Sequence, residues 1–363
     1  METVIVQAES LHGLVTRIAA AVGTGSEAAD TLATHLIGAE LAGVQTHGIF
    51  HIPKYLGEIE RGELVPGAEP RVRERSAGRL LVSGELCFGQ VAAEHLTRAA
   101  IPLAREAGMA VGGLVRANHI GRLGHYAELA AAEGLVSLIC AGGFGVTGAR
   151  AAPFGGRDRL LDTNPFCMGF PADREAPVVI DFATTALSGV KVANAQARGE
   201  RLPPASIVDS EGRPTTDPED FFAGGAYRPF GGETSGHKGF AIMLAVELLG
   251  RLFTGADAHA VPDEGVPLMR HQGATFLLLR ADLFQPLSAV LDGNDALLAA
   301  IRESAPAAGN DRVLYPGLSE ARTRAHRQRH GIPIARDIWD RFAAAASGLG
   351  IDAGDTGVAS DSG

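Results

Sequence analysis

The sequence has very few cysteines. Its 363 residues include only Cys87, Cys140 and Cys167. They are odd in number, far apart and set in apolar surroundings, which favours neither a disulfide framework nor a zinc site. We therefore expect a reducing compartment.

Clustered positive charge is also lacking. Lys and Arg number 32 against 42 Asp and Glu, which gives a formal net charge of -10. Phosphate backbones require clustered cations, so this balance argues against nucleic acid as the main partner. The one Arg-rich segment, residues 321–330 (ARTRAHRQRH), is interpreted as the solvated face of a helix.

The sequence lacks a secretory signal and a long apolar run. The first ten residues, METVIVQAES, carry an early acid and no basic flank. The best membrane candidate, residues 240–250, is interrupted by Glu247, whereas a membrane helix needs roughly 20 apolar residues. We predict a cytoplasmic protein with no membrane partner.

Periodicity in the remaining sequence predicts helices around a group of strands. Ser26–Leu41 reads as an amphipathic helix with Ser26 as its N-cap. Residues 151–181 alternate turns with short apolar runs, which predicts antiparallel strands, and residues 201–221 are expected to form a surface loop. Further strands are predicted at 79–84, 109–115, 135–141 and 274–280, and further helices at 90–107, 236–252 and 287–304.

This pattern predicts the fold class α/β, of the α+β type. Because the central strands are flanked by helices at both ends, we expect a discontinuous helical outer domain formed by residues 1–75 with 285–345. Residues 76–284 then form a mostly antiparallel sheet domain with a smaller helical subdomain. Residues 346–363 form a tail with few large apolar groups, which we expect to be disordered.

The stretch GFGVTG, Gly143 to Gly148, has the G-x-G-x-x-G spacing of a dinucleotide-binding Rossmann loop. That loop must open a helix whose N–H groups face the pyrophosphate. Residues 149–166 instead contain Pro153, Gly155, Gly156 and Pro165, which disfavour a helix. The sequence therefore argues against a Rossmann fold.

The histidines are the strongest chemical signal, because imidazole exchanges protons near neutral pH. His47 in QTHGI and His119 in ANHIGRLGHY lie in loops bordered by glycine. The H-x-x-x-H spacing of His47 with His51, and of His326 with His330, does not predict a metal site, because no glutamate or cysteine pair accompanies it. The serine-hydrolase elbow G-x-S-x-G does not occur in the sequence.

A helix that begins near Gly236 would place Lys238 beside free N–H groups, as in an anion site. An ordinary solvated lysine explains the same residues. Both interpretations stay open at this point.

Several motifs in order resemble the malate/L-lactate dehydrogenase family of NAD(P)-dependent oxidoreductases without a Rossmann fold. They are AELAGVQTHGI with Tyr55, ANHIGRLGHY, DTNPF, IDFATT with Lys191, GRPTTDP and GHKGF, and they lie between residues 39 and 317. The resemblance implies a cofactor, NAD or NADP, on a mostly antiparallel sheet within residues 76–284. It also implies a homodimer that acts on a small molecule near the subunit interface.

The resemblance assigns roles to the matching residues. His119 matches the catalytic acid/base, and His47 a second histidine that is credited with proton donation in some members. The substrate-binding positions are His51, Tyr55, Arg122 and Thr163. The cofactor-binding positions are Asn164, Asp181, Phe182, Ala183, Thr184, Thr185, Lys191, His237, Lys238, Gly239, Pro316 and Gly317.

One departure concerns the substrate. Members that bind a 2-oxo acid typically carry arginine where this chain has His51, and imidazole does not reproduce the bidentate contact of a guanidinium with a carboxylate. The implied reaction is hydride transfer to or from a 2-oxo or 2-hydroxy acid or a related ketone. Reduction of a cyclic imine such as piperideine- or pyrroline-2-carboxylate is the alternative. A non-catalytic cofactor-binding protein and a metal-dependent lyase or hydrolase are further alternatives.

Overall fold

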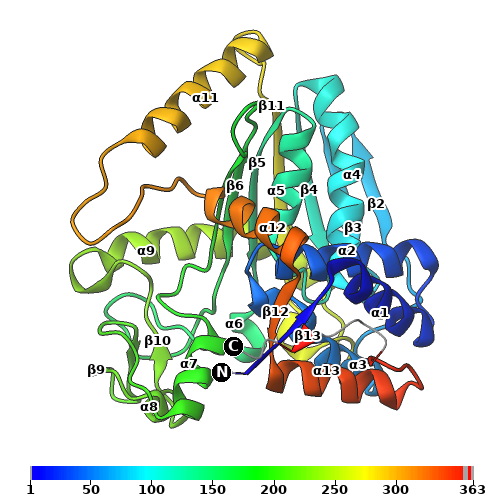
Figure 1. Cartoon of the computed structure of the whole chain (residues 1–363), viewed down its shortest axis with the longest axis vertical. Helices are drawn as coiled ribbons and strands as arrows, with labels where there is room; N and C mark the ends of the chain where they lie inside the picture. Colours follow the sequence, from blue (N-terminus) through cyan, green and yellow to red (C-terminus); the bar gives the residue numbers. More distant parts are fainter. Residues whose placement is uncertain (1, 355–358, 361–363) are drawn as a thin grey trace.

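The computed structural model describes residues 2–354, 359 and 360, and its centre is a seven-stranded sheet (Figure 1). The strands in spatial order are β2 (Arg71–Ser76), β3 (Arg79–Ser83), β4 (Met109–Val115), β11 (Gly273–Arg280), β5 (Leu135–Gly142), β6 (Phe166–Phe170) and β7 (Val178–Phe182). Every pairing is antiparallel except β3 with β4. The exception follows from the long crossover helix α4 (Gly89–Ala107) between these two strands.

The two faces of the sheet are covered by different helices. On β11, Phe276 packs edge-on against Tyr126 of α5 (Leu123–Ala132), whereas the neighbouring Thr275 hydroxyl donates to Leu249 O. Successive strand residues point to opposite faces, so α4 and α5 cover one face. The other face is covered by α9 (Gly232–Glu247) and the π-helical turn that continues it, η3 (Leu248–Leu252).

Both ends of the chain meet in a second core. Strand β1 (Thr3–Val6) pairs with β12 (Ile332–Ala335) and with β13 (Ala359–Ser360). Helices α1 (Ala8–Ala21), α2 (Ser26–Leu41), α3 (Ile52–Glu60) and α13 (Arg336–Gly348) contribute to this core. We call this core the terminal core. The core between the seven-stranded sheet and helices α4 and α5 is called the sheet core, and the partly buried Val91 packs against both.

The remaining elements lie around these cores. A three-stranded sheet of β8 (Ile207–Val208), β9 (Pro214–Thr215) and β10 (Ala226–Tyr227) packs with α7 (Gly189–Arg198) and α8 (Pro218–Phe222). The short turns are η1 (Gln45–His47), η2 (Ile49–His51), α6 (Gly145–Gly148), α10 (Ala256–His259) and η4 (Pro267–Met269). Helix α11 (Leu287–Glu303) and the Arg-rich helix α12 (Leu318–His330) precede β12.

Several local predictions are wrong. Gly25, not Ser26, is the N-cap of α2, and no side chain caps that end. Residues 201–221 are not a plain loop, because they contain β8, β9 and most of α8. In the tail predicted from residue 346, Ala346 and Ala353 are buried in the terminal core. Residues 355–358 and 361–363 of that tail lie outside the described residues.

We also expected no segment long and apolar enough for a membrane helix. By the criteria of length and composition this expectation is wrong. Gly232–His259 is a helical stretch of 28 residues with a mean hydropathy of 1.5 in its apolar window, 33% of which is buried. Glu247 does not interrupt the apolar outer face of this helical stretch, because its carboxylate points inward and accepts hydrogen bonds from Gly143 and Asn164. One face of the stretch packs on β5 and β11, as in a core helix.

Candidate active site

Three histidines and a tyrosine from distant parts of the chain form a cluster between the two cores. Tyr55 on α3 lies 2.8 Å from His119 Nδ1 through its hydroxyl oxygen. The His119 ring lies 4.5 Å from the ring of His51 and 5.6 Å from that of His47, centroid to centroid. The structure thus brings together four residues that the sequence predicted as catalytic or substrate-binding.

The loop that carries His47 and His51 is shaped by a buried carboxylate. Glu40 Oε1, near the end of α2, accepts a hydrogen bond from Ile49 N at 3.0 Å. A Cβ on Gly48 would lie 2.0 Å from that oxygen, so only glycine leaves room for Glu40. His51 Nε2 lies 2.9 Å from Thr46 O, which makes this nitrogen the donor and fixes the ring within the loop.

A fourth histidine, His35, supports the loop that carries His119. His35 Nε2 accepts a hydrogen bond from Arg122 N at 2.9 Å, and both residues are buried. Gly121 has φ of 70° and its missing side chain leaves space for the His35 ring. The Gln272 side chain donates to Ala117 O at 3.2 Å and Asn118 O at 3.0 Å. The loop is therefore held through its backbone, and the His119 ring faces α3.

The clustered imidazoles are neutral near pH 7. Burial, with the neighbouring cations adding to it, lowers the pKa of His47 to about 4 and that of His51 to about 3. Burial, followed by the charges of His51 and His47, holds the pKa of His119 well below 6.5. Burial raises the pKa of the Tyr55 phenol above its usual value, so this residue keeps its proton.

Arg122, whose charge lowers the pKa of His47, is already paired with a carboxylate. Arg122 Nη2 lies 2.7 Å from Glu128 Oε1, and Arg324 pairs with the same carboxylate at 2.9 Å. Asp181 accepts from Gly124 N at 2.7 Å, and burial raises its pKa while Arg122 opposes the shift. Arg122, predicted to bind substrate, is therefore part of an internal charge network next to the histidines.

One carboxylate joins the GFGVTG stretch to the DTNPF turn. Glu247 Oε2 accepts from Gly143 N and from the Asn164 side chain, each at 2.9 Å. The Thr184 hydroxyl lies 3.0 Å from both Thr163 O and Asn164 O. A helix of the Rossmann type does not follow the stretch, whose last four residues form the short α6. The side chains of Asn164 and Thr184, predicted to bind cofactor, thus bond to protein groups.

The other predicted cofactor positions lie on three segments. On β7 and beyond it, Asp181, Phe182 and Ala183 are partly buried, and Thr185 donates to Leu187 O. Lys191, His237 and Lys238 are exposed, whereas Gly239 is buried. Pro316 O accepts from Val179 N at 3.1 Å, which places the turn of Pro316 and Gly317 beside β7.

The anion site predicted at a helix start near Gly236 is wrong in position. The helix begins at Gly232, so His237 and Lys238 occupy its second turn, where N–H groups are bonded within the helix. Gly231 and Gly232 both have positive φ and lead into the first turn. Two consecutive glycines in a sequence are typical of a turn, so the true start of the helix was not predicted.

A different polar group at the start of α7 was not predicted. Ser188 Oγ and Tyr227 Oη are buried, and neither has a hydrogen-bond partner in the described part of the chain. A Cβ on Gly189 would lie 3.0 Å from Tyr227 Oη, and Lys191 is in the same first turn of α7. Buried polar atoms are normally satisfied, so these hydroxyls fit an oxygen-rich ligand. The serine before a helix was the available sequence signal.

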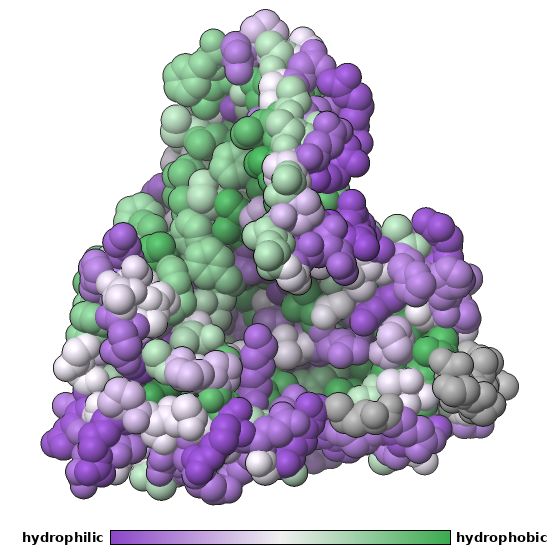
Figure 2. Space-filling view, turned by 60° about the vertical axis from the view of Figure 1, so that its left-hand side comes forward, coloured by the Kyte–Doolittle hydropathy of each residue, from purple (hydrophilic) through white to green (hydrophobic). Residues whose placement is uncertain are grey.

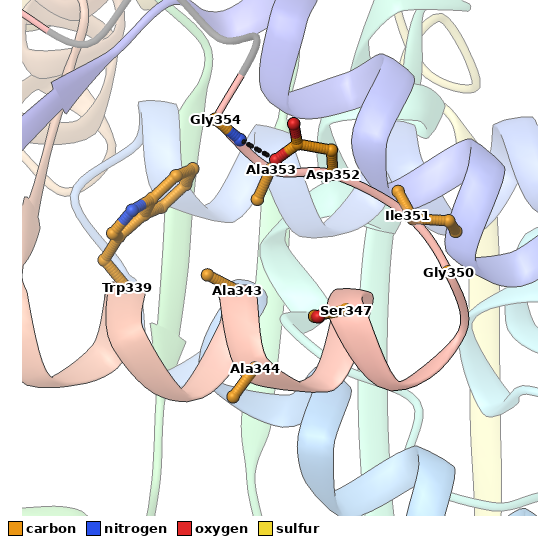
Figure 3. A pocket seen from close by; sticks show the side chains of 9 residues that line it. All are labelled: Trp339, Ala343, Ala344, Ser347, Gly350, Ile351, Asp352, Ala353 and Gly354. Atoms are coloured by element: carbon orange, nitrogen blue, oxygen red, sulfur yellow. Dashed lines mark hydrogen bonds between the residues drawn. The ribbon is translucent and has the colours of Figure 1, made fainter.

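Neither the open pocket on α13 nor a metal site competes with the histidine cluster. The pocket encloses about 650 Å³ beside Trp339 and Ala343, and its only ionisable side chain is that of Asp352 (Figure 3). Among the described residues, no three His, Cys, Asp or Glu side chains converge as metal ligands. The rings of His326 and His330 lie 4.5 Å apart on α12 without a third ligand.

Known proteins resemble this chain along nearly its whole length. A family model described as malate/L-lactate dehydrogenase matches residues 6–343. Hydroxycarboxylate dehydrogenase B of Escherichia coli (strain K12) is 31% identical, over 95% of this chain and 94% of its own. L-lactate dehydrogenase of Cupriavidus necator is 33% identical, over 94% of this chain and 97% of its own.

Solved structures agree with these relatives. A putative malate/lactate dehydrogenase from E. coli superposes with a TM-score of 0.86 and 30% identity, and 96% of each chain is covered. The delta1-piperideine-2-carboxylate reductase from Pseudomonas syringae has a TM-score of 0.80 and 29% identity, over 94% of this chain and 99% of the other.

The Glu40–Gly48 contact leads to a stability prediction. Gly48→Ala expels the Glu40 carboxylate from Ile49 N and leaves buried polar groups unpaired, so we expect a loss of at least about 2 kcal/mol in the free energy of unfolding. Gly38→Ala on α2 is the matched control, because a Cβ there meets nothing within 4 Å. It should be neutral or stabilising by up to about 1 kcal/mol. Equal stability of the two variants in urea denaturation would contradict this account.

Proposed function

The chain belongs to the malate/L-lactate dehydrogenase family, and on that premise we propose that it transfers hydride between NAD or NADP and a 2-oxo or 2-hydroxy acid. It is an oxidoreductase with a small-molecule substrate. His119 exchanges the proton of the reaction, and His47 and His51 lie beside it. The cytoplasm is the proposed compartment.

The main observation that supports this proposal is the hydrogen bonding of the two ring nitrogens of His119. Its Nδ1 is engaged by the Tyr55 hydroxyl at 2.8 Å, while its Nε2 bonds to no described residue and the side chain is only partly buried. Reduction of a carbonyl needs a proton on oxygen as well as a hydride on carbon. An imidazole with one nitrogen fixed and the other free can give that proton and, in the reverse direction, accept it.

The residues at the edge of the sheet fit a nicotinamide dinucleotide, which when bound supplies the hydride. The hydroxyls of Ser188 and Tyr227, which have no hydrogen-bond partner among the described residues, lie at the N-terminus of α7. The N–H groups there and Lys191 favour phosphate oxygens. Phe182 and the turn of Pro316 and Gly317 offer apolar and backbone surface beside β7. These residues would hold the cofactor next to the histidines.

Reduction of a cyclic 2-imino acid is the second candidate, and the electrostatics of the cluster favour it. A protonated imine is a cation, which a site of imidazolium groups would repel. Here burial keeps His47, His51 and His119 neutral near pH 7. The fold is also shared with a piperideine-2-carboxylate reductase. Comparison of oxo acids with cyclic imines separates the two candidates.

We further propose that the protein is a homodimer. Several large apolar side chains are exposed: Leu248 and Leu252 on η3, Phe253 directly after it, Phe284 shortly before α11, and Leu297 on α11. Figure 2 shows a broad hydrophobic area on the side that carries α9 and α11. Exposed apolar areas of this kind mark contact surfaces. A dimer would sediment with twice the chain mass of 37.6 kDa.

The central test is an assay with a single-residue variant. With NADH or NADPH and a panel of 2-oxo acids, ketones and cyclic imines, the wild-type protein should oxidise the cofactor. His119→Ala should lower turnover at least about a hundredfold because the proton donor is lost. Calorimetry should show unchanged cofactor affinity in the variant.

Three outcomes of this assay would count against the proposal. Absence of cofactor oxidation with every substrate, together with absence of cofactor binding, would exclude an NAD(P)-dependent enzyme. Cofactor binding without turnover would favour the non-catalytic alternative. Turnover of His119→Ala close to that of wild type would remove His119 from the mechanism.

The lowered pKa of His119 predicts the pH dependence. Oxidation of a hydroxy acid needs the neutral base, which predominates above the His119 pKa, so kcat/KM should still exceed half its plateau at pH 6.5 and fall only in more acid solution. Reduction needs the protonated form and should accelerate as the pH falls. A profile of oxidation whose acid limb has its midpoint above pH 7 would contradict the neutral cluster.

A further inference from the structure

Beneath the Tyr55–His119 pair lies a glutamine that no motif singles out. Gln90, the second residue of α4, donates from Nε2 to the Tyr55 hydroxyl oxygen at 2.7 Å. Its side chain is completely buried, and its Oε1 has no partner among the described residues. A buried amide oxygen without a partner is costly, so its placement requires an explanation.

The start of α4 is built to approach His119. A Cβ on Gly89 would lie 2.1 Å from Asn118 O and 2.4 Å from His119 O, so the helix touches the backbone of the catalytic loop there. The Phe88 ring meets the Tyr55 ring edge-on at 5.8 Å. Three successive residues, Phe88 to Gln90, therefore contact Tyr55 or the His119 backbone.

We propose that Gln90 is a positioning residue whose amide orientation selects the tautomer of His119. This proposal rests on the proposed function in one respect, because it assumes that His119 exchanges a proton in the reaction. Gln90 does not touch the substrate. It acts through Tyr55, which can donate one hydrogen bond and accept another.

Two arrangements of the same three side chains satisfy the hydrogen bonds of Tyr55. In the first, Gln90 Nε2–H donates to Tyr55 as the structure shows. The Tyr55 O–H is then left to donate to His119 Nδ1, 2.8 Å away, and the ring proton of neutral His119 is on Nε2. With the amide turned over, Gln90 Oε1 accepts from Tyr55 O–H and Tyr55 accepts from His119 Nδ1–H. The lone pair of His119 is then on Nε2.

The second arrangement is the one that proton exchange requires. In reduction, imidazolium His119 gives its Nε2 proton to the substrate oxygen, the N–H electron pair stays on Nε2, and the ring is left with its proton on Nδ1. In oxidation, Nε2 accepts the hydroxyl proton by the reverse step. The first arrangement, which matches the amide orientation in the structure, is on this proposal a resting state that lacks the Nε2 lone pair. Rotation of the Gln90 amide connects the two.

Other groups also act on His119. His51, His47, Lys54 and His35 each lower its pKa by their charge, after burial itself. These groups act on the ring through space. The hydrogen bond to Tyr55, in contrast, contacts Nδ1 directly and fixes whether that nitrogen donates or accepts.

The test is ¹⁵N NMR of histidine-labelled protein at pH 8, where the ring shifts identify the tautomer of neutral His119. Wild type should carry the proton on Nε2. Gln90→Glu, whose carboxylate only accepts, should move it to Nδ1, and Gln90→Met should give a mixture. In a Tyr55→Phe background, Gln90→Glu should leave the tautomer unchanged because the connection is cut.

Gln272→Met is the matched control. Gln272 is buried, has an unpartnered Oε1 and supports the same loop, but through the backbone of Ala117 and Asn118. This variant should keep the wild-type tautomer even if its stability falls. A switch of tautomer in Gln272→Met equal to that in Gln90→Glu would overturn the assignment, because loop distortion alone would then be enough.

Kinetics provide the second readout. Gln90→Met should lower kcat about tenfold with an unchanged KM for the cofactor, and Gln90→Glu should move the acid limb of the pH profile toward higher pH by about one unit. Wild-type tautomer and kcat within twofold of wild type in both variants would overturn the proposal. If wild type itself shows no turnover, the proposed function fails, but the NMR comparison still decides the role of Gln90.

Discussion

The hydrogen bond between Tyr55 and His119 is the contact on which the candidate site depends. Tyr55 belongs to the terminal core and His119 to the loop that leaves the sheet core, so the bond exists only when the two cores are packed together. Val91, in the first turn of α4, packs against both cores. The two ends of the chain thus form one core that packs against the sheet domain, and the histidine cluster forms where the two cores meet.

Burial determines the chemistry of this cluster. Imidazoles removed from water resist protonation, and each one that is charged would repel the others. The result is a neutral group of rings that can exchange a single proton and does not present a permanent cation to the substrate. Arg122, which acts on His47 by its charge, is paired with Glu128. Residue 51 is a histidine, so it offers no guanidinium to a carboxylate.

The sequence predicted elements whose patterns are local. Strand β4 and helix α11 were predicted to within one residue of their ends, because apolar runs and flanking glycines or prolines mark them. His47 and His119 stood out by their glycine-bordered loops. Gln90 and Glu247 did not, because each acts on a partner far along the chain: Gln90 on Tyr55 at a separation of 35 residues, and Glu247 on Gly143 at 104. The three-dimensional fold alone brings such pairs together.

A crystal structure with NADH and a non-reactive 2-oxo acid analogue such as oxamate would test the central claim most directly. The account predicts that the oxygen of the analogue that corresponds to the carbonyl lies about 3 Å from His119 Nε2, with the nicotinamide ring on the adjacent side. An analogue bound elsewhere, for example in the pocket beside Trp339, with no atom in hydrogen-bond reach of His119, would contradict it.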